Sequence, residues 1–171
     1  MNNSSLDSRR GAAIIPLCRA PEHAAECARW AYDEWYRRRD MDPEIVYGAF
    51  RRRARRADMP FTLVAVDGNA PVGMATLKLK DLRSMPDLGP WLSSLYVIPA
   101  RRGEGIGTSL ISAVAEEARR REFHELFLFL SQRHMALLEG FYTKREWRCI
   151  ATALDNDGRT TKVFRLELNQ R

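Results

Sequence analysis

The stretch that decides the fold of this sequence is LYVIPARRGEGIGT, residues 95–108. It begins with apolar and aromatic residues, which is typical of a strand, and Pro99 ends that run. Gly103, Gly105 and Gly107 follow at alternate positions, and an amphipathic helix begins at the last of them. Glycines at a strand-to-helix junction allow a ligand close to the backbone, and the free amides of a helix start favour an anion. The stretch therefore predicts a phosphate-binding turn.

Two common phosphate motifs do not fit this turn. A P-loop requires a lysine after its last glycine, but Thr108 and Ser109 follow Gly107. The dinucleotide fingerprint Gly-x-Gly-x-x-Gly fails at its third glycine, whether it is counted from Gly103 or from Gly105. The two arginines just before the glycines add charge-assisted hydrogen bonds, so an anionic ligand of another kind is expected.

Strand and helix patterns fill the rest of the chain without an internal repeat. Asp42 and Pro43 are typical of an N-cap and a first helical residue. The unbroken apolar run at 126–130 indicates a strand buried on both faces. The expected elements, in chain order, are a strand at 13–17, helices at 21–39 and from 43, strands at 61–66, 72–79 and 91–98, a helix at 107–121, a strand at 126–130, a helix at 135–146 and strands at 148–154 and 160–168. This order predicts a mixed α/β (α+β) domain.

Length and composition predict one globular domain over residues 12–171, after a flexible tail at 1–11. The chain has 171 residues, of which 45% are hydrophobic and 29% charged. No apolar run approaches the ~18–20 residues of a membrane helix, so no membrane association is expected. The N-terminus does not resemble a signal peptide, and three cysteines without framework spacing fit a reducing, cytoplasmic location.

The formal net charge is +6, and 24 arginines stand against 4 lysines. Nucleic acid or an anionic ligand would explain this surplus, and a biased codon composition would explain the preference for arginine without any function. The arginine clusters at 37–39 and 51–56 lack interleaved aromatic residues, so we interpret them as solvated helix faces. An acidic acceptor is the alternative, and nucleic acid is not the expected partner.

Arg102, Gly105 and Gly107 form the pattern Arg-x-x-Gly-x-Gly, preceded by an apolar strand that ends in Val97-x-Pro99. This pattern resembles the acetyl-CoA motif of the Gcn5-related N-acetyltransferase (GNAT) superfamily, and the element order agrees over residues 12–168. The resemblance implies the GNAT fold, a mixed and mostly antiparallel sheet of about seven strands flanked by about four helices. In that fold the sheet splays at a slot for acetyl-CoA.

The resemblance also implies roles for the backbone of the motif. Leu95 and Val97 would pair with the amides of the pantetheine arm like an added strand. The N–H of Val97 would stabilise the oxyanion that develops on the thioester carbonyl. The pyrophosphate would be cradled by the amides of Arg102, Gly103, Gly105, Ile106, Gly107 and Thr108.

Tyr142 is the implied general acid, because the family commonly carries a tyrosine in its last helix that protonates the departing thiolate. The local sequence is FYTKREW, residues 141–147, with Glu146 where the family usually has glycine. That glycine would end the helix, so Glu146 calls the local backbone into question. The alternative is that Tyr142 is a buried packing residue.

The general base is not identified by the sequence. Many family members place a glutamate just before the motif, where this chain has Ser93 and Ser94. Neither serine is a competent base, so a water chain or a residue from elsewhere would serve. The candidates are Glu34, Asp81, Asp87 and His134. The histidines and cysteines lack ligand spacing, so no metal is predicted.

In this family the first two helices and the loop between them usually form a wall of the acceptor site, and the long irregular loop before the motif strand is expected to form another. The predicted acceptor residues are Glu34, Trp35, Tyr36 and Asp81, with Met41 and the loop at 80–91 nearby. The predicted function is transfer of an acetyl group from acetyl-CoA to a primary amine of a small molecule or peptide. The open alternatives are a catalytically degenerate CoA-binding or sensing domain and the use of another acyl-CoA. Family members are often homodimers, so a homodimer is also open.

Overall fold

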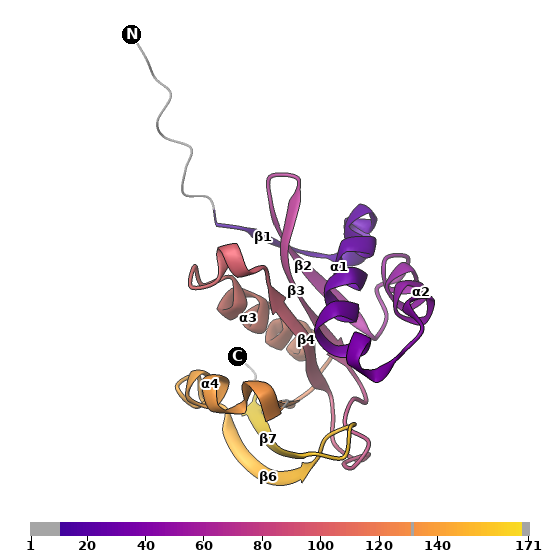
Figure 1. Cartoon of the computed structure of the whole chain (residues 1–171). Helices are drawn as coiled ribbons and strands as arrows, with labels where there is room; N and C mark the ends of the chain where they lie inside the picture. Colours follow the sequence, from indigo (N-terminus) through magenta and orange to yellow (C-terminus); the bar gives the residue numbers. More distant parts are fainter. Residues whose placement is uncertain (1–10, 131, 169–171) are drawn as a thin grey trace.

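The computed structural model describes residues 11–130 and 132–168, so residues 1–10 of the predicted tail lie outside the described residues. This part of the chain contains seven strands and four α-helices (Figure 1). The strands are β1 (Ala13–Pro16), β2 (Phe61–Asp67), β3 (Ala70–Lys78), β4 (Trp91–Val97), β5 (Glu125–Phe129), β6 (Arg148–Leu154) and β7 (Thr160–Glu167). The α-helices are α1 (Ala24–Ala31), α2 (Pro43–Arg53), α3 (Ile106–Arg120) and α4 (Gln132–Thr143). The shorter helical turns are η1 (Leu17–Arg19), η2 (Pro21–His23), η3 (Tyr32–Tyr36), η4 (Arg37–Arg39) and η5 (Pro99–Arg101).

The strands form one sheet in the order β1-β2-β3-β4-β5-β7-β6. Every neighbouring pair is antiparallel except β4 and β5, which are parallel. The connection between β4 and β5 contains α3, as a parallel pair requires a crossover. The mixed, mostly antiparallel sheet with flanking helices confirms the predicted fold class.

Helices cover both faces of the sheet because its central strands are buried on both sides. In β2, Leu63 and Ala65 belong to the core that contains α3. Their neighbours Val64 and Val66 belong to the core beneath α1 and α2. Figure 1 shows α1 and α2 on one side of β3 and β4, with α3 on the other. Successive side chains of a strand point to opposite faces of the sheet, and this alternation determines which helices each residue packs against.

The predicted helix at 21–39 is interrupted. The structure divides it into η2, α1, a π-helical turn at η3 and a 3-10 turn at η4. Asp40 ends the run in the left-handed conformation, with a φ of 50°. The expected apolar positions do not reveal the widened turn, because Ala31 and Trp35 are four residues apart, a spacing that an α-helix also places on one face.

The end of α4 explains the glutamate at the position of the family's glycine. Glu146 adopts a φ of 66°, the left-handed conformation that commonly closes a helix. The carbonyl of Tyr142 accepts hydrogen bonds from the amides of Arg145 (2.9 Å) and Trp147 (3.3 Å). The turn therefore keeps the shape that glycine would give it, at a cost of roughly 1–2 kcal/mol.

Candidate active site

β4 and β5 are paired at the first residue of β4 and separate beyond it. They pair at one register position, Trp91 with Phe127. From residue 92 to Val97, the side of β4 that faces β5 has no strand partner in the described part of the chain, whereas the other side remains paired to β3. We call this unpaired side, residues 92–97, the open β4 edge. A strand edge with free N–H and C=O groups is a template for an extended ligand.

A β-bulge bends β4 within the open edge. Ser94 and Leu95 together face Ala75 of β3, and the strand register shifts there. Ser94 has a φ of 53°, in the left-handed region that few residues other than glycine adopt. Bulges re-aim the groups that follow them and are common beside active sites. Here the bulge includes Leu95 and comes two residues before Val97, the two residues expected to contact the pantetheine arm.

The glycine turn leaves its amides available for an anion. Gly103 and Gly105 both have a φ of 84°, and a Cβ on either would meet no atom within 4 Å. The first hydrogen bond of α3 runs from the amide of Ser109 to the carbonyl of Gly105. The amides at 106–108 therefore have no acceptor within the helix. Together with the helix dipole, they form a site suited to a pyrophosphate.

The two arginines before the glycines have different partners. Arg101 is held by Asp67 and Glu104, at N–O distances of 2.6 and 2.7 Å, so it fixes the turn against the β2–β3 hairpin. Arg102 donates from Nε to the carbonyl of Val97 at 3.0 Å. The amide of Arg102 donates to the carbonyl of Pro99 at 3.3 Å. This amide is therefore used inside the turn, unlike the role expected from the sequence.

Arg145 is a residue of this site that sequence reasoning missed. Its guanidinium donates to the hydroxyl oxygen of Thr108 at 3.2 Å, at the start of α3. The same group donates to the carbonyl of Phe141 and stacks on that ring, 3.7 Å from the centroid. The spacing of four residues between Phe141 and Arg145 could have indicated the stacking but not the contact with Thr108.

Tyr142 is buried, with 4% of its surface exposed. Its ring packs edge-on against Phe141 and Trp147, at centroid distances of 5.1 and 5.8 Å. Burial raises the pKa of Tyr142 well above its usual value, so the hydroxyl remains protonated at neutral pH. A proton donor is therefore present, in apolar surroundings that favour a neutral phenol.

The structure brings together two of the four candidate bases. Glu34 of η3 lies beside His134 in the first turn of α4, with an Oε1–Nε2 distance of 3.4 Å. Trp35 and Tyr36, on the same turn, are half-buried against the core beneath α1 and α2. Glu34, one of the predicted acceptor residues of this turn, therefore lies next to a histidine from the other half of the chain.

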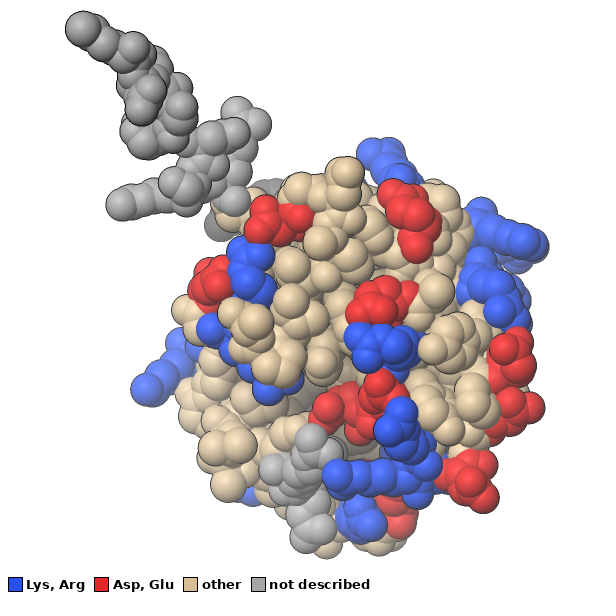
Figure 2. Space-filling view, turned by 45° about the horizontal axis from the view of Figure 1, so that its top comes forward, with Lys and Arg blue, Asp and Glu red and all other residues tan. Residues whose placement is uncertain are grey.

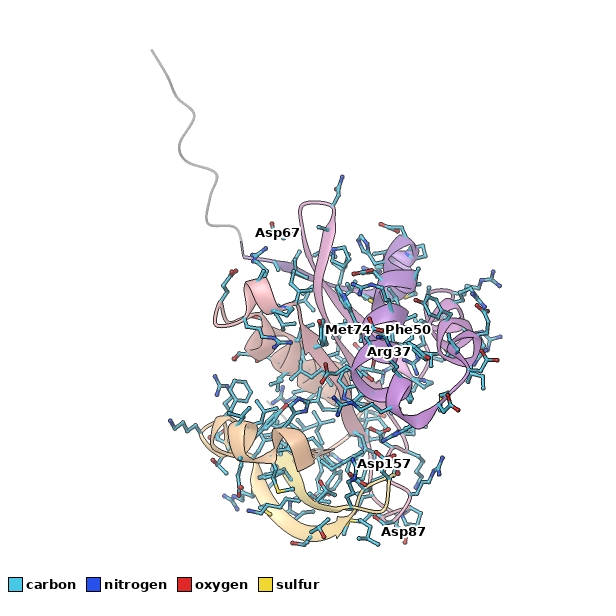
Figure 3. All side chains as sticks on the ribbon, in the orientation of Figure 1. Arg37, Phe50, Asp67, Met74, Asp87 and Asp157 are labelled. Carbon is cyan, nitrogen blue, oxygen red and sulfur yellow. The ribbon has the colours of Figure 1, made fainter. Side chains whose placement is uncertain are left out.

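The other two candidate bases are placed differently. Asp81 forms an ion pair with Lys78 at 2.9 Å, and both side chains are 14% exposed. Asp87 lies on the outer loop at the far side of the β6–β7 turn from Arg37 (Figure 3).

The turn between β6 and β7 contacts both η4 and the loop before β4, which the sequence did not predict. Asp157 forms an ion pair with Arg39 of η4 at 2.7 Å. Asn156 donates to the carbonyl of Asp81 at 2.8 Å and accepts from the amide of Arg83 at 3.0 Å. The turn therefore anchors both the loop before β4 and the segment after α1.

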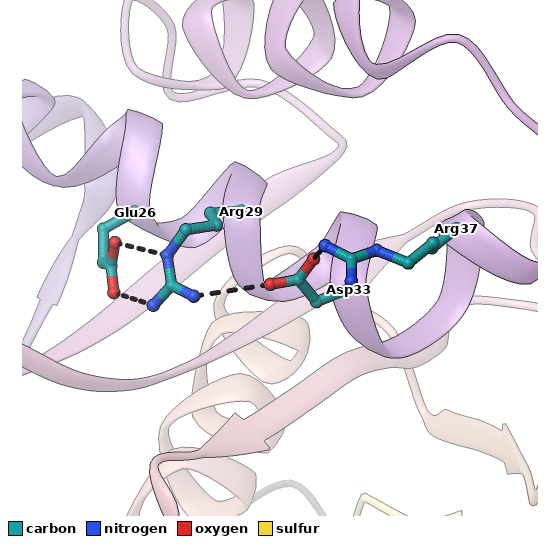
Figure 4. Close-up of polar contacts among 4 residues, drawn as sticks. All are labelled: Glu26, Arg29, Asp33 and Arg37. Atoms are coloured by element: carbon teal, nitrogen blue, oxygen red, sulfur yellow. Dashed lines mark hydrogen bonds and ion pairs between the residues drawn. The ribbon is translucent and has the colours of Figure 1, made fainter.

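Two of the arginines near α1, Arg29 and Arg37, are paired with carboxylates of the same helical segment. Figure 4 shows Glu26, Arg29, Asp33 and Arg37 as an alternating chain of contacts on α1 and the turns after it. On the face in Figure 2, basic and acidic side chains are interspersed. This arrangement favours solvated helix faces as the interpretation of the arginine clusters.

The cysteines predict how thiol reagents will react with the protein. Cys149 is exposed, whereas Cys27 is buried and burial raises its pKa to about 12. With dithiobis(nitrobenzoate) at pH 8, we expect Cys149 to react rapidly and Cys27 only after unfolding, because the thiolate is the nucleophile. Absorbance in native buffer and in urea measures both phases. A rapid phase of the same size in Cys149→Ser would contradict this assignment.

The fold and the glycine turn before α3 define an acetyltransferase of the GNAT type, and sequence comparison agrees. A family model described as the acetyltransferase (GNAT) family matches residues 22–148. The chain belongs to this family. No match was found among curated protein sequences.

Solved structures with the same fold cover nearly the whole chain. An aminoglycoside 6'-N-acetyltransferase complexed with coenzyme A has a TM-score of 0.69 at 16% identity, over 93% of this chain and 98% of its own. The protein yncA from Salmonella typhimurium, with its cofactor acetyl-CoA, has a TM-score of 0.66 at 20% identity, over 95% and 96%. An N-acetyltransferase from Staphylococcus aureus Mu50 has a TM-score of 0.69 at 17% identity, over 94% and 100%.

Within residues 11–130 and 132–168, no helix is long and apolar enough to span a membrane. The same residues contain no cluster of three His, Cys, Asp or Glu side chains placed to hold a metal ion.

Proposed function

We propose that this chain transfers an acetyl group from acetyl-CoA to a primary amine by direct attack of the amine on the thioester. The observation that carries the proposal is the open β4 edge, which runs directly into a glycine turn with free helix amides. An unpaired strand edge suits the amides of a pantetheine arm, and the turn suits its pyrophosphate. The cysteine usage favours action in a reducing, cytoplasmic compartment.

In this proposal the chain holds acetyl-CoA mainly through its backbone. Leu95 and Val97 pair with the pantetheine amides, and Gly103, Gly105 and the amides at 106–108 hold the pyrophosphate. Acetyl-CoA supplies the activated acetyl group. The absence of a Cβ at 103 and 105 leaves the space that a phosphate needs close to the backbone.

Two groups of the chain assist the transfer. The N–H of Val97 donates to the carbonyl oxygen as negative charge develops on it. Tyr142 donates its phenolic proton to the departing sulfur, and the phenol is restored by a proton from the attacking nitrogen.

The acceptor binds, in this proposal, between the Tyr32–Arg39 segment and the β6–β7 turn. Trp35 and Tyr36 supply apolar surface there, and Glu34 supplies negative charge for an ammonium group. One structural neighbour is an aminoglycoside 6'-N-acetyltransferase, so an aminoglycoside is the first acceptor to test.

The test measures release of the coenzyme A thiol from acetyl-CoA with kanamycin, spermidine and a glycyl peptide amide, in a Cys149→Ser background. Release that requires both the amine and acetyl-CoA supports the proposal. Binding of acetyl-CoA without release above the amine-free rate would indicate the degenerate sensing domain instead. Faster release from propionyl-CoA or succinyl-CoA would indicate a different acyl donor.

We expect Arg145→Ala to weaken acetyl-CoA binding about tenfold, because a charge-assisted bond to a phosphate contributes about 1.5–3 kcal/mol. The reason is the position of the guanidinium, 3.2 Å from Thr108 at the start of α3. Isothermal titration measures the dissociation constant, and Lys144→Ala is the control because it removes the same charge from the next residue, an exposed one. Equal constants for the two variants would rule out a contact between Arg145 and the ligand.

A further inference from the structure

The carboxylate–imidazole contact between Glu34 and His134 joins two segments that are far apart in the sequence. Glu34 lies in the π-helical turn after α1, and His134 lies in the first turn of α4, which follows β5. Their side chains are 19% and 30% exposed, and Oε1 lies 3.4 Å from Nε2. The pair therefore connects the half of the molecule on the β4 side of the sheet opening with the half on the β5 side. Both side chains of the pair are therefore partly exposed to solvent.

The π-helical turn separates the roles of two adjacent carboxylates. Asp33 faces along the helix, where it contacts Arg29 and Arg37 (Figure 4). Glu34 faces the other half of the chain instead. A π turn stores an extra residue in a helix and often occurs at functional sites. Here it directs one carboxylate away from the chain of arginine contacts and toward a histidine.

The chemistry of the proposed function requires a base that this pair can supply. An amine in water near neutral pH is mainly an ammonium ion, which has no lone pair for attack. Ser93 and Ser94, at the end of the open β4 edge, cannot accept its proton. Asp81 is neutralised by Lys78. A histidine beside a carboxylate is the side-chain arrangement that accepts a proton and stabilises the resulting charge.

We propose that His134 is the general base for the acceptor and that Glu34 positions it, an inference that rests on the proposed function. A ring nitrogen of His134 accepts one proton from the ammonium nitrogen, so that one N–H bond breaks and one forms. The Glu34 carboxylate stays ionised and stabilises the imidazolium. His134 later releases this proton to water. The free amine then attacks the thioester carbon, and the second proton lost by the nitrogen restores the phenol of Tyr142.

The charged groups on the neighbouring elements have other partners. On α4, Glu139 pairs with Lys162 of β7 at 2.7 Å. On η4, Arg39 pairs with Asp157 of the β6–β7 turn. The Glu34 carboxylate, with Oε1 3.4 Å from Nε2 of His134, should stabilise the protonated form of this imidazole.

The chain also provides a matched control. Glu22 and His23 form a second carboxylate–histidine contact at 3.9 Å, at the opposite end of α1 from η3. His23 is 8% exposed, and its turn comes before α1. A substitution of His23 by glutamine removes the same chemical group without touching the π-helical turn.

The experiment compares His134→Gln with His23→Gln, using acceptors that do and do not need deprotonation. Thiol release is measured with the most reactive of kanamycin, spermidine and the glycyl peptide amide, and with hydroxylamine, which is mainly uncharged at pH 7.5. We expect His134→Gln to lower kcat/KM for the ammonium acceptor by about 10²–10⁴-fold. The rate with hydroxylamine should change by less than about twofold, because no proton must be removed before attack. His23→Gln should change neither rate.

Glu34→Gln tests the positioning role. We expect the acid limb of its pH profile for kcat/KM to move to lower pH, since an imidazolium without a neighbouring carboxylate loses its proton more easily. Equal losses with both acceptors in His134→Gln, or an unmoved acid limb in Glu34→Gln, would overturn this inference while leaving the transferase intact. If the wild type binds acetyl-CoA but releases no thiol with any amine, the proposed function itself fails. The two failures are therefore distinguishable.

Discussion

Replacing Tyr142 by phenylalanine is expected to lower kcat by about 10²–10⁴-fold, the usual contribution of a positioned general acid. The thiolate must then leave without a proton from the protein. The ring contacts with Phe141 and Trp147 are retained, so the free energy of unfolding should change by about 1 kcal/mol or less. The measurement is kcat at saturating acetyl-CoA, together with the unfolding transition of both proteins.

The pH dependence of the same reaction tests the protonation state of Tyr142. Because burial raises its pKa above the usual value near 10, the phenol stays protonated through the alkaline range of ordinary assays. We expect no loss of kcat from this group below about pH 10, since a raised pKa shifts deprotonation to higher pH. An unchanged kcat in Tyr142→Phe would leave this residue with a packing role alone.

Replacing Gly105 by alanine is expected to weaken acetyl-CoA binding by about 10–100-fold. The new Cβ would stand in the open space beside the helix start, where the proposal places the pyrophosphate. Displacing a phosphate from charge-assisted hydrogen bonds costs about 1.5–3 kcal/mol for each bond lost. The measurement is the dissociation constant from isothermal titration.

Backbone strain alone does not account for this expectation, and a second glycine provides the control. Gly158 of the β6–β7 turn also has a positive φ, of 77°, and a Cβ there would likewise meet no atom within 4 Å. Gly158→Ala therefore introduces a similar strain, about 1–2 kcal/mol, away from the glycine turn. We expect both variants to unfold at lower temperature and only Gly105→Ala to lose affinity. A similar loss in Gly158→Ala would show that stability, and not the site, controls binding.

The sequence predicted the part of the site in which residue type determines backbone shape. Residues 95–108 required a strand, a tight turn with positive φ at glycine and a helix start, and the structure has each of them. Strand alternation and helical periodicity then predicted the elements around them, since burial on two faces leaves a clear pattern.

Features that depend on contacts between distant segments were not predictable in the same way. The π-helical turn at η3 has no signature in apolar periodicity, and it is what directs Glu34 toward His134. Glu146 adopts the left-handed conformation, and glutamate as a residue type does not predict that conformation. Arg145 reaches Thr108 only because α4 packs near the start of α3.

The residues of the acceptor side stay a prediction, for which the structure supplies positions. Trp35 and Tyr36 lie on the turn that carries Glu34. Asp81 forms an ion pair with Lys78. The contribution of the β6–β7 turn depends on single ion pairs and hydrogen bonds, such as that between Arg39 and Asp157, which no local pattern encodes.

The central claim is that the open β4 edge and the glycine turn bind acetyl-CoA, and thermal unfolding with and without acetyl-CoA tests it most directly. At a ligand concentration about 100 times Kd, binding should stabilise the protein by about 2.7 kcal/mol. For a domain of this size that corresponds to an increase in Tm of roughly 5–10 °C. We expect this increase in the wild type and its loss in Gly105→Ala. No increase at millimolar acetyl-CoA would contradict the claim.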